Sequence, residues 1–250
     1  MNGKQKIIKL FDENVRGKRP ETSSYNQDHD GKSGHWLEVQ MGVKANASNA
    51  PDLFGYEMKN HTKDKTTWGD WSASYYIFKK DSGYNISKKE FLHIFGKSNT
   101  NKDGRYSWSG EPCPKIGKFN NFGQILKIDP DNNILALYYF SKDNRVDKLK
   151  IVPHNMQIEA LILARWDAAK LEKLVERKFN QSGWFKCLKN KQGIYTKIVF
   201  GPPINYSDWL KLVRSQDAFF DSGMNEGTSR NRSDWRSNNS VWERLIDSSY

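Results

Sequence analysis

Apolar and polar positions follow two different spacings along this chain, and together they predict a mixture of helices and strands. Apolar residues that recur every three to four positions predict amphipathic helices, whereas apolar runs bounded by turn residues predict strands. Helices are predicted at residues 4–12, 88–95, 167–179 and 206–216. Strands are predicted at residues 74–78, 123–128, 133–140, 148–152, 183–190 and 193–200. The helix over 167–179 is expected to turn four basic side chains to solvent, namely Lys170, Lys173, Arg177 and Lys178.

Residues 50–59 contain the pattern with the clearest chemical meaning. Pro51 suits the entrance of a strand, because it has no amide hydrogen to donate within a sheet. If side chains alternate from Leu53 onward, Glu57 and Lys59 share the face of Leu53. A twist or bulge at the strand mouth then turns Asp52 toward Glu57. Two carboxylates and one ammonium group are therefore predicted to converge.

These three groups suit the hydrolysis of a phosphodiester. Asp52 and Glu57 can hold Mg²⁺, a cation that prefers oxygen ligands. The metal lowers the pKa of a bound water and neutralises charge on the phosphorus oxygens. Lys59 can orient the attacking water or stabilise the transition state. On these residues alone, a surface strand with an ion pair between positions i and i+2 is the simpler interpretation.

The stretch just before this pattern favours the chemical interpretation. Residues 33–44 carry apolar side chains after a Ser-Gly start, which predicts a short helix that begins near Ser33. Glu38 lies within the apolar set of this helix. A carboxylate on a mostly buried face needs a partner or a metal, so Glu38 joins the candidate site.

A helix with an acidic residue, a short linker and then Pro-Asp…Glu-x-Lys resembles the MutH-like branch of the PD-(D/E)xK nucleases. The matching residues are Gly34, Leu37, Glu38, Gly42, Pro51, Asp52, Tyr56, Glu57, Met58 and Lys59. The layout is most similar to that of type II restriction endonucleases of the MvaI and BcnI type. The resemblance implies an α/β fold with a mixed central sheet and flanking helices. It also implies two lobes around a DNA cleft, a catalytic lobe over residues 1–150 and a C-terminal lobe over residues 151–250, with a single sheet shared by both lobes as the alternative.

The resemblance also implies an activity. It is Mg²⁺-dependent, sequence-specific hydrolysis of double-stranded DNA that leaves a 5′-phosphate. Asp52 and Glu57 would ligate the metal, and Lys59 would position the water. Glu38 would assist through a second metal or its bound water. The implied enzyme is a monomer, with a homodimer as the alternative.

The charge of the chain fits a nucleic-acid partner. Lys and Arg together number 40 against 29 Asp and Glu, which gives a formal net charge of +11. An excess of this size favours a polyanionic partner and speeds encounter with it. On charge alone, a basic protein without such a partner remains an alternative.

Two polar loops are predicted to contact DNA. The first follows the Glu-x-Lys strand, where the chain of MutH-like enzymes approaches the duplex; its candidates are Lys63, Lys65 and Thr67. The second covers residues 96–118, and its arginine and aromatic side chains favour groove contact or base stacking. Its candidates are Arg105, Tyr106 and Trp108. The alternatives are a solvated hairpin tip for the first loop and, for the second, a surface loop whose aromatics anchor it in the core.

Residues 221–240 are dense in side chains that can read base edges in the major groove. The candidates are Arg230, Arg232, Asp234, Arg236 and Asn238. In the MvaI and BcnI enzymes the corresponding loop helps to read the recognition sequence. Apolar residues on both sides, Phe219, Phe220 and Trp242, favour an anchored recognition loop over the alternative, a flexible tail.

The remaining signals place the protein in a reducing compartment. Cys113 and Cys187 lie far apart and lack metal-like spacing. The N-terminus is too charged for a secretory signal, and no apolar run approaches the ~20 residues that span a bilayer. A cytoplasmic protein is predicted. Two further functions stay open, a mismatch-repair nicking enzyme like MutH and a DNA-binding module without catalysis.

Overall fold

The computed structural model describes residues 1–24, 31–43, 49–60, 62 and 64–250. The chain forms two compact units, each built from separated segments. The first unit contains residues 1–66, 173–209 and 238–250, and the second contains residues 67–172 and 210–237. These units interleave along the chain.

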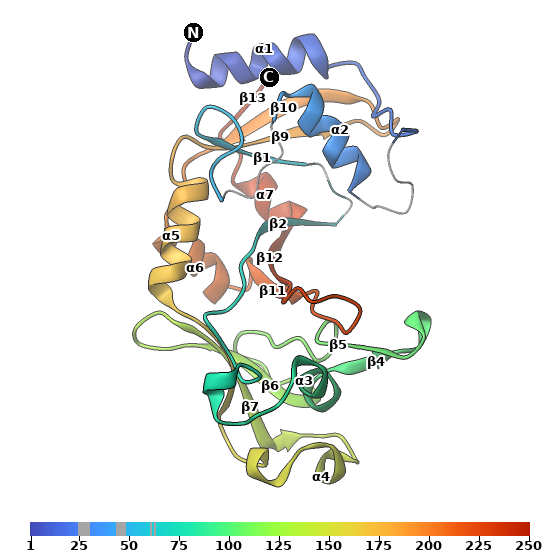
Figure 1. The fold of residues 1–250 in the computed structure, drawn as a ribbon. Coiled ribbons are helices and arrows are strands. Elements are labelled where there is room, and N and C mark those ends of the chain that lie inside the picture. Colours follow the sequence, from blue (N-terminus) through green and yellow to red (C-terminus); the bar gives the residue numbers. More distant parts are fainter. Residues whose placement is uncertain (25–30, 44–48, 61, 63) are drawn as a thin grey trace. The chain divides into compact units, whose positions relative to one another are not determined.

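The first unit is a four-stranded mixed sheet with helices on both faces (Figure 1). Its strands run in the order β1 (Tyr56–Lys59), β9 (Gly183–Lys189), β10 (Tyr195–Gly201) and β13 (Ser248–Ser249). Strand β1 is parallel to β9, and the other pairs are antiparallel. The helices are α1 (Gly3–Asn14), α2 (Lys32–Gln40), the C-terminal part of α5 (Ala168–Phe179), the first turn of α6 (Tyr206–Arg214) and α7 (Asn239–Arg244).

Alternation along β1 and β9 separates the two faces of this sheet. Met58 and Phe185 point into an apolar cluster that α1 and α2 close with Phe11, Trp36 and Leu37. The opposite face carries Glu57 and Lys59 on β1 and Trp184 and Lys186 on β9, and residues of α5 and α7 pack against this face. Helix α1 starts at a reciprocal capping box between Asn2 and Gln5.

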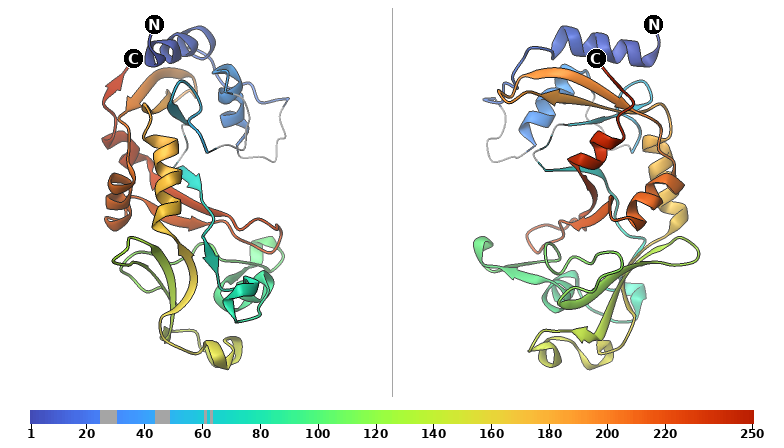
Figure 2. Two further views of the ribbon diagram at one scale, coloured as in Figure 1. Left: turned by 60° about the vertical axis from the view of Figure 1, so that its left-hand side comes forward. Right: turned by 180° about the vertical axis from the view of Figure 1, so that it is seen from behind.

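The second unit contains three sheets (Figure 2). The first sheet has the strand order β3 (Tyr75–Tyr76), β8 (Leu161–Trp166), β7 (Ile134–Asp143) and β6 (Phe122–Ile128). The second sheet has the order β11 (Phe219–Ser222), β12 (Ser233–Asn238) and β2 (Lys65–Asp70). The third sheet pairs β4 (Lys97–Asn99) with β5 (Arg105–Ser107). Its helices are α3 (Lys88–Phe95) and α4 (Lys148–Ile151), with 3₁₀ turns at Lys80–Ser82, Thr100–Lys102 and His154–Met156. The buried rings of Trp166, Phe220 and Trp235 pack together in this unit, Trp166 edge-to-face against the other two.

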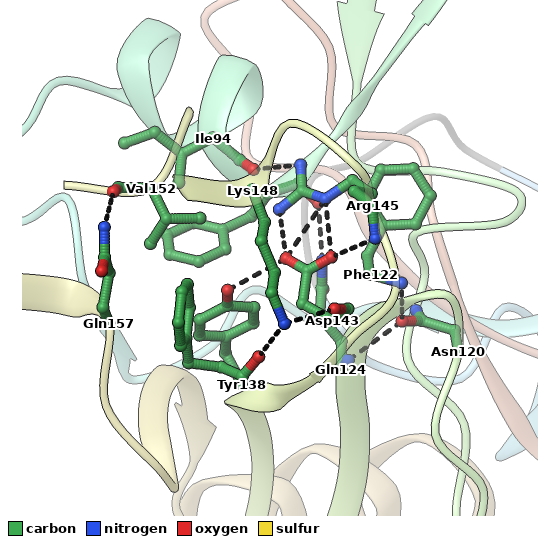
Figure 3. Close-up of polar contacts among 12 residues, drawn as sticks. Ile94, Asn120, Phe122, Gln124, Tyr138, Asp143, Arg145, Lys148, Val152 and Gln157 are labelled. Atoms are coloured by element: carbon green, nitrogen blue, oxygen red, sulfur yellow. Dashed lines mark hydrogen bonds and ion pairs between the residues drawn. The ribbon is translucent and has the colours of Figure 1, made fainter. Parts of the chain in front are cut away.

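A buried polar network ties the end of β7 to helix α3 in the second unit (Figure 3). The carboxylate of Asp143 is fully buried; it accepts hydrogen bonds from Tyr138 Oη at 2.9 Å and Arg145 Nη2 at 2.7 Å. Arg145 Nη1 also donates to the carbonyl oxygen of Ile94 at 2.7 Å. Lys148 donates to the backbone oxygen of Asp143. Because every buried charge here has partners, the network stabilises the unit instead of straining it.

The structure confirms most predicted elements and corrects four. The stretch 148–152 is helix α4 instead of a strand, and β8 occupies residues 161–166, for which no strand is predicted. Residues 65–70, expected to be a loop, form β2, and the expected long loop over 96–118 contains the β4–β5 hairpin. No helix in the described residues is both long and apolar enough to cross a bilayer.

Candidate active site and DNA-contact surface

A tight reversal of the backbone brings Asp52 beside strand β1. The amide groups of Leu53 and Tyr56 donate to each other's carbonyl oxygens at 3.0 and 2.8 Å. Phe54 and Gly55 between them have φ angles of +49° and +83°. A side chain at Gly55 would be strained at this φ, and its Cβ would lie 2.6 Å from Ser182 Oγ. The chain therefore folds back, and Asp52 Oδ2 accepts the amide hydrogen of Met58 at 2.8 Å.

This reversal corrects one prediction about the faces of the strand. Leu53 packs against the apolar cluster that contains Met58, so it lies on the face opposite Glu57 and Lys59. The alternation predicted for Glu57, Met58 and Lys59 themselves is confirmed. The strand begins at Tyr56, after the turn, and a strand period counted from Leu53 therefore fails.

Glu57 and Lys59 form a buried ion pair. Their side chains are only 5% and 8% exposed, and Lys59 Nζ donates to Glu57 Oε1 at 2.9 Å. The Lys59 ammonium also lies 5.0 Å from the ring centre of Phe179 and 5.9 Å from that of Trp242. Glu57 Oε2 is buried and has no hydrogen-bond partner among the described residues. One oxygen of this carboxylate is therefore left for a ligand.

The local environment shifts the titration of these groups. Burial, followed by the negative charge of Glu57, raises the pKa of Asp52 to about 6. Burial lowers the pKa of Lys59, although the Glu57 carboxylate opposes this effect. Shifts with these causes are typical of functional sites. The predicted convergence of Asp52, Glu57 and Lys59 is present in the structure.

A second lysine reaches the same carboxylate. Lys178 Nζ lies 3.2 Å from Glu57 Oε1, and the Lys178 side chain is 20% exposed. The prediction that Lys178 faces solvent is therefore wrong. Helical spacing contained the signal, because Lys178 is seven residues after the buried Leu171 and three after the buried Val175, on the same helical face.

A third lysine on this sheet face is also buried. Lys186 lies beside Lys59 in the parallel register of β1 and β9. Its ammonium donates to Asn239 Oδ1 at 3.0 Å and Thr66 Oγ1 at 3.3 Å. Burial lowers its pKa to about 8. The sequence does not single out Lys186, because a lysine within an otherwise apolar strand does not indicate which residues its side chain will contact.

The predicted acid Glu38 is not gathered with Asp52 and Glu57. Its carboxylate is 47% exposed and lies 3.6 Å from His35 Nδ1. In the part of the chain that the structure describes, no group of three or more acidic, His or Cys residues could hold a metal ion. Gly34, one helical turn before Glu38, lies against the side chain of Asn60, which follows Lys59. Helix α2 thus presents the Glu38 side of its surface toward the end of β1.

The residues expected to contact DNA after β1 have different exposures. Lys63 lies outside the described residues. Lys65 is exposed at the start of β2, and Thr67 is half-buried. Asn239 supports this segment, because its Nδ2 donates to the carbonyl oxygen of Thr62 and its Oδ1 accepts from Thr66 Oγ1.

The three candidates on β5 and just after it differ in accessibility. Trp108 is fully buried and donates to Gln124 Oε1, so it anchors this segment in the core and offers no surface for base stacking. Tyr106 is half-buried and stacks on His93 with ring centres 4.0 Å apart. Arg105 is half-buried, and its Nε has no hydrogen-bond partner among the described residues. For Trp108, the predicted stacking on DNA is therefore wrong.

The candidates near the C-terminus lie on an antiparallel hairpin of β11, β12 and the connecting loop of residues 223–232 (Figure 2). Arg236 bridges Asp234 at 3.0 Å and Asp221 at 3.3 Å, and Arg232 lies 3.6 Å from Asp234. Burial raises the pKa of Asp234, and the two arginines oppose this. Arg230 pairs with Asp70, and Asn238 is exposed at the end of β12. Positive and negative side chains thus alternate over residues 232–236 of the hairpin, at Arg232, Asp234 and Arg236.

Comparisons with known proteins relate the chain to restriction endonucleases. The model of the LlaMI restriction endonuclease family matches residues 15–250. The chain is 45% identical over 262 residues to the type II restriction enzyme ScrFI of Lactococcus lactis subsp. cremoris, covering 97% of each protein. Among solved structures, it resembles the restriction endonuclease MvaI in a complex with cognate DNA, with a TM-score of 0.64, 11% identity and coverage of 99% and 95%. MvaI without DNA matches with a TM-score of 0.48 and 13% identity, over 98% of this chain and 94% of MvaI.

Proposed function

The chain belongs to the LlaMI restriction endonuclease family, and from this premise we propose that it is a Mg²⁺-dependent enzyme whose active site is Asp52, Glu57 and Lys59. Family membership makes it a type II restriction endonuclease, which hydrolyses DNA. The metal, the residues and the product, a 5′-phosphate, are the proposed parts. The observation that carries them is the buried Glu57 Oε2, which has no hydrogen-bond partner among the described residues, near the Asp52 carboxylate.

The donor set fits a hard divalent cation. Asp52 and Glu57 supply carboxylate oxygens, and Mg²⁺ commonly binds through one or two carboxylates while it keeps several waters. When bound, the metal would activate a water and neutralise charge on the phosphate. The amide of Met58 holds Asp52 in place, and Lys59 holds Glu57, so both carboxylates are oriented before a ligand arrives.

Lys59 and Glu38 take separate roles in this proposal. The Lys59 amine pairs with Glu57 and orients the attacking water. Glu38 assists from helix α2 through a second metal or a bound water; its place on the helix side that approaches Asn60 supports this role.

We assign DNA contact to two surfaces. The first is Lys65 and Thr67 after β1. Lys63 is proposed as a contact from its sequence position alone, because it lies outside the described residues. The second is Arg105 and Tyr106 with the hairpin residues Arg230, Arg232, Arg236 and Asn238. Asp234 is buried, so its proposed part is to orient Arg232 and Arg236. Arginine, asparagine and acidic side chains can each match the edge of a particular base. The ion pairs of the hairpin support this assignment, because they hold Asp234 and Arg236 in fixed orientations. The enzyme is proposed to act as a monomer, with a homodimer as the alternative.

The substitution Asp52→Ala tests the active site. The variant should lose cleavage of plasmid DNA in Mg²⁺ by more than about 10³-fold, because one of two metal ligands is gone. Its binding to the same DNA in EDTA, measured by gel shift without a divalent cation, should stay close to that of the wild type. Normal cleavage by the variant would exclude Asp52 from the mechanism.

The wild-type digest in the same experiment separates the functions. Discrete double-strand fragments are expected from a restriction enzyme, preceded by nicked circles if a monomer cuts one strand at a time. Nicking without fragments would favour a MutH-like activity that needs a partner protein. Metal-independent binding without any cleavage would favour a non-catalytic module.

A further inference from the structure

The ion pair between Lys178 and Glu57 has no evident structural need. Glu57 Oε1 already accepts a hydrogen bond from Lys59 at 2.9 Å, and Lys59 is itself held against the rings of Phe179 and Trp242. Lys178 nevertheless brings a second ammonium group to the same oxygen, at 3.2 Å. Burying most of a lysine side chain costs solvation and rotamer entropy. A second cation at an already satisfied oxygen therefore calls for a functional account.

Lys178 changes the total charge of the candidate metal site. Without it, two carboxylates face one ammonium group, and the cluster is negative. With it, the charges of Asp52 and Glu57 are balanced by those of Lys59 and Lys178, the two ammonium groups at Glu57 Oε1. The third lysine of this sheet face, Lys186, instead donates to Thr66 and Asn239. A divalent cation that approaches a balanced cluster gains little net attraction. The effect is strong here, because Glu57 and Lys59 are buried and poorly screened by salt.

We propose that Lys178 is a positioning residue that keeps the affinity of the free protein for a divalent cation low and thereby couples cation binding to DNA binding. This inference rests on the proposed metal site at Asp52 and Glu57. The DNA phosphate supplies the negative charge that the balanced cluster lacks, so cation and duplex bind more tightly together than either binds alone. Such coupling is reciprocal, and each ligand raises the affinity for the other by the same factor.

The same contact orients Glu57. Both ammonium groups lie at Oε1, while Oε2 has no partner among the described residues. Lys178 therefore acts through Glu57, holding the carboxylate with its free oxygen available while its own charge opposes early binding of the cation.

Calorimetric titration of the DNA-free protein with Mn²⁺ tests the proposal. Lys178→Met should bind Mn²⁺ about tenfold more tightly than the wild type, because one nearby positive charge is removed. Lys178→Gln keeps a hydrogen-bond donor for Glu57 without the charge and should show the same increase. The matched control is Lys173→Met on the exposed side of the same helix, which should leave the affinity unchanged.

A second experiment measures the coupling between cation binding and DNA binding. Ca²⁺ should strengthen the binding of plasmid fragments to the wild type by a larger factor than to Lys178→Met or Lys178→Gln. Circular dichroism confirms folding of each variant, and either neutral variant alone suffices for the comparison.

These experiments distinguish an error in the proposed role of Lys178 from an error in the proposed metal site. If Asp52→Asn abolishes Mn²⁺ binding but neither neutral Lys178 variant binds Mn²⁺ more tightly, the role of Lys178 is excluded and the metal site stands. If Asp52→Asn binds Mn²⁺ as the wild type does, the proposed metal site is itself wrong.

Discussion

The position and the raised pKa of Asp52 both depend on one short turn. The reversal at Phe54 and Gly55 carries its carboxylate back to the amide of Met58, close to a second carboxylate in a partly buried position. Its pKa is raised because burial and the Glu57 charge both disfavour the ionised form, and these outweigh the hydrogen bond from Met58. A bound cation would reverse this balance, since it favours the ionised form.

Stability in the absence of metal should report this raised pKa. The pKa of Asp52 is about 6 in the folded protein, whereas an aspartate in the unfolded chain has its ordinary pKa of 3.8. This contribution to stability is fully present below pH 3.8 and is lost as the pH rises through 6. In EDTA, the stability of the wild type relative to Asp52→Asn should therefore fall by roughly 1–3 kcal/mol between pH 4 and 7. Urea unfolding at several pH values measures the difference, and parallel curves would contradict the assignment.

For single residues, the sequence predicts which side chains form the candidate site better than it predicts which residues surround them. The spacing of Asp52, Glu57 and Lys59 is enough to predict their convergence. It does not indicate Lys186, which is brought next to Lys59 by the parallel pairing of strands far apart in sequence. The helical period places Lys178 on the same face as buried apolar residues, but a charged residue beside apolar ones is usually assigned to the solvent side.

The β11–β12 hairpin is held by contacts from α3 and β5. Lys88 Nζ, at the start of α3, donates to the carbonyl oxygens of Thr228 and Arg230 at 2.7 and 2.8 Å. Glu226 accepts the amide hydrogen of Tyr106 and lies 2.6 Å from His93 Nε2. The connecting loop is thus fixed along its length, and preorganisation of this kind lowers the entropy that binding must cost.

Loosening this loop should weaken DNA binding. In Lys88→Met two charge-assisted hydrogen bonds to backbone carbonyls are lost. The affinity in Ca²⁺ for a fragment that the wild type cleaves should fall about tenfold, with less discrimination against other fragments. Lys89→Met, at the exposed neighbouring position, serves as the control. Equal affinities for both variants would show that the loop has no part in binding.

Element prediction succeeds where a periodic pattern is long. Helices α3 and α5 and the β6–β7 and β9–β10 pairs were predicted within a few residues, because several turns or alternations define each of them. The four-residue helix α4 and the polar strand β2 were not, since neither has enough periodic apolar positions to outweigh its polar composition. Strand β2 exists because it pairs within the sheet of β11 and β12.

For the whole molecule, net charge predicts how binding depends on salt. The formal charge of +11 and the candidate phosphate contacts imply that DNA binding releases many counterions. If about six phosphates are contacted, the affinity in Ca²⁺ should fall roughly 10³-fold between 50 and 200 mM salt. Fluorescence anisotropy with labelled duplex measures the slope. An affinity independent of salt would exclude phosphate contact as a main source of binding.

The interleaving of the two units restricts how this enzyme can be recombined with its relatives. The chain passes between the units within β2, α5, α6 and β12, so no linker separates them. A chimaera that exchanges the second unit must splice the chain at four points, each inside a helix or a strand. Every splice must then preserve the register of that element on both sides. New specificities are therefore expected to arise in this architecture by point changes on the hairpin more readily than by wholesale domain exchange.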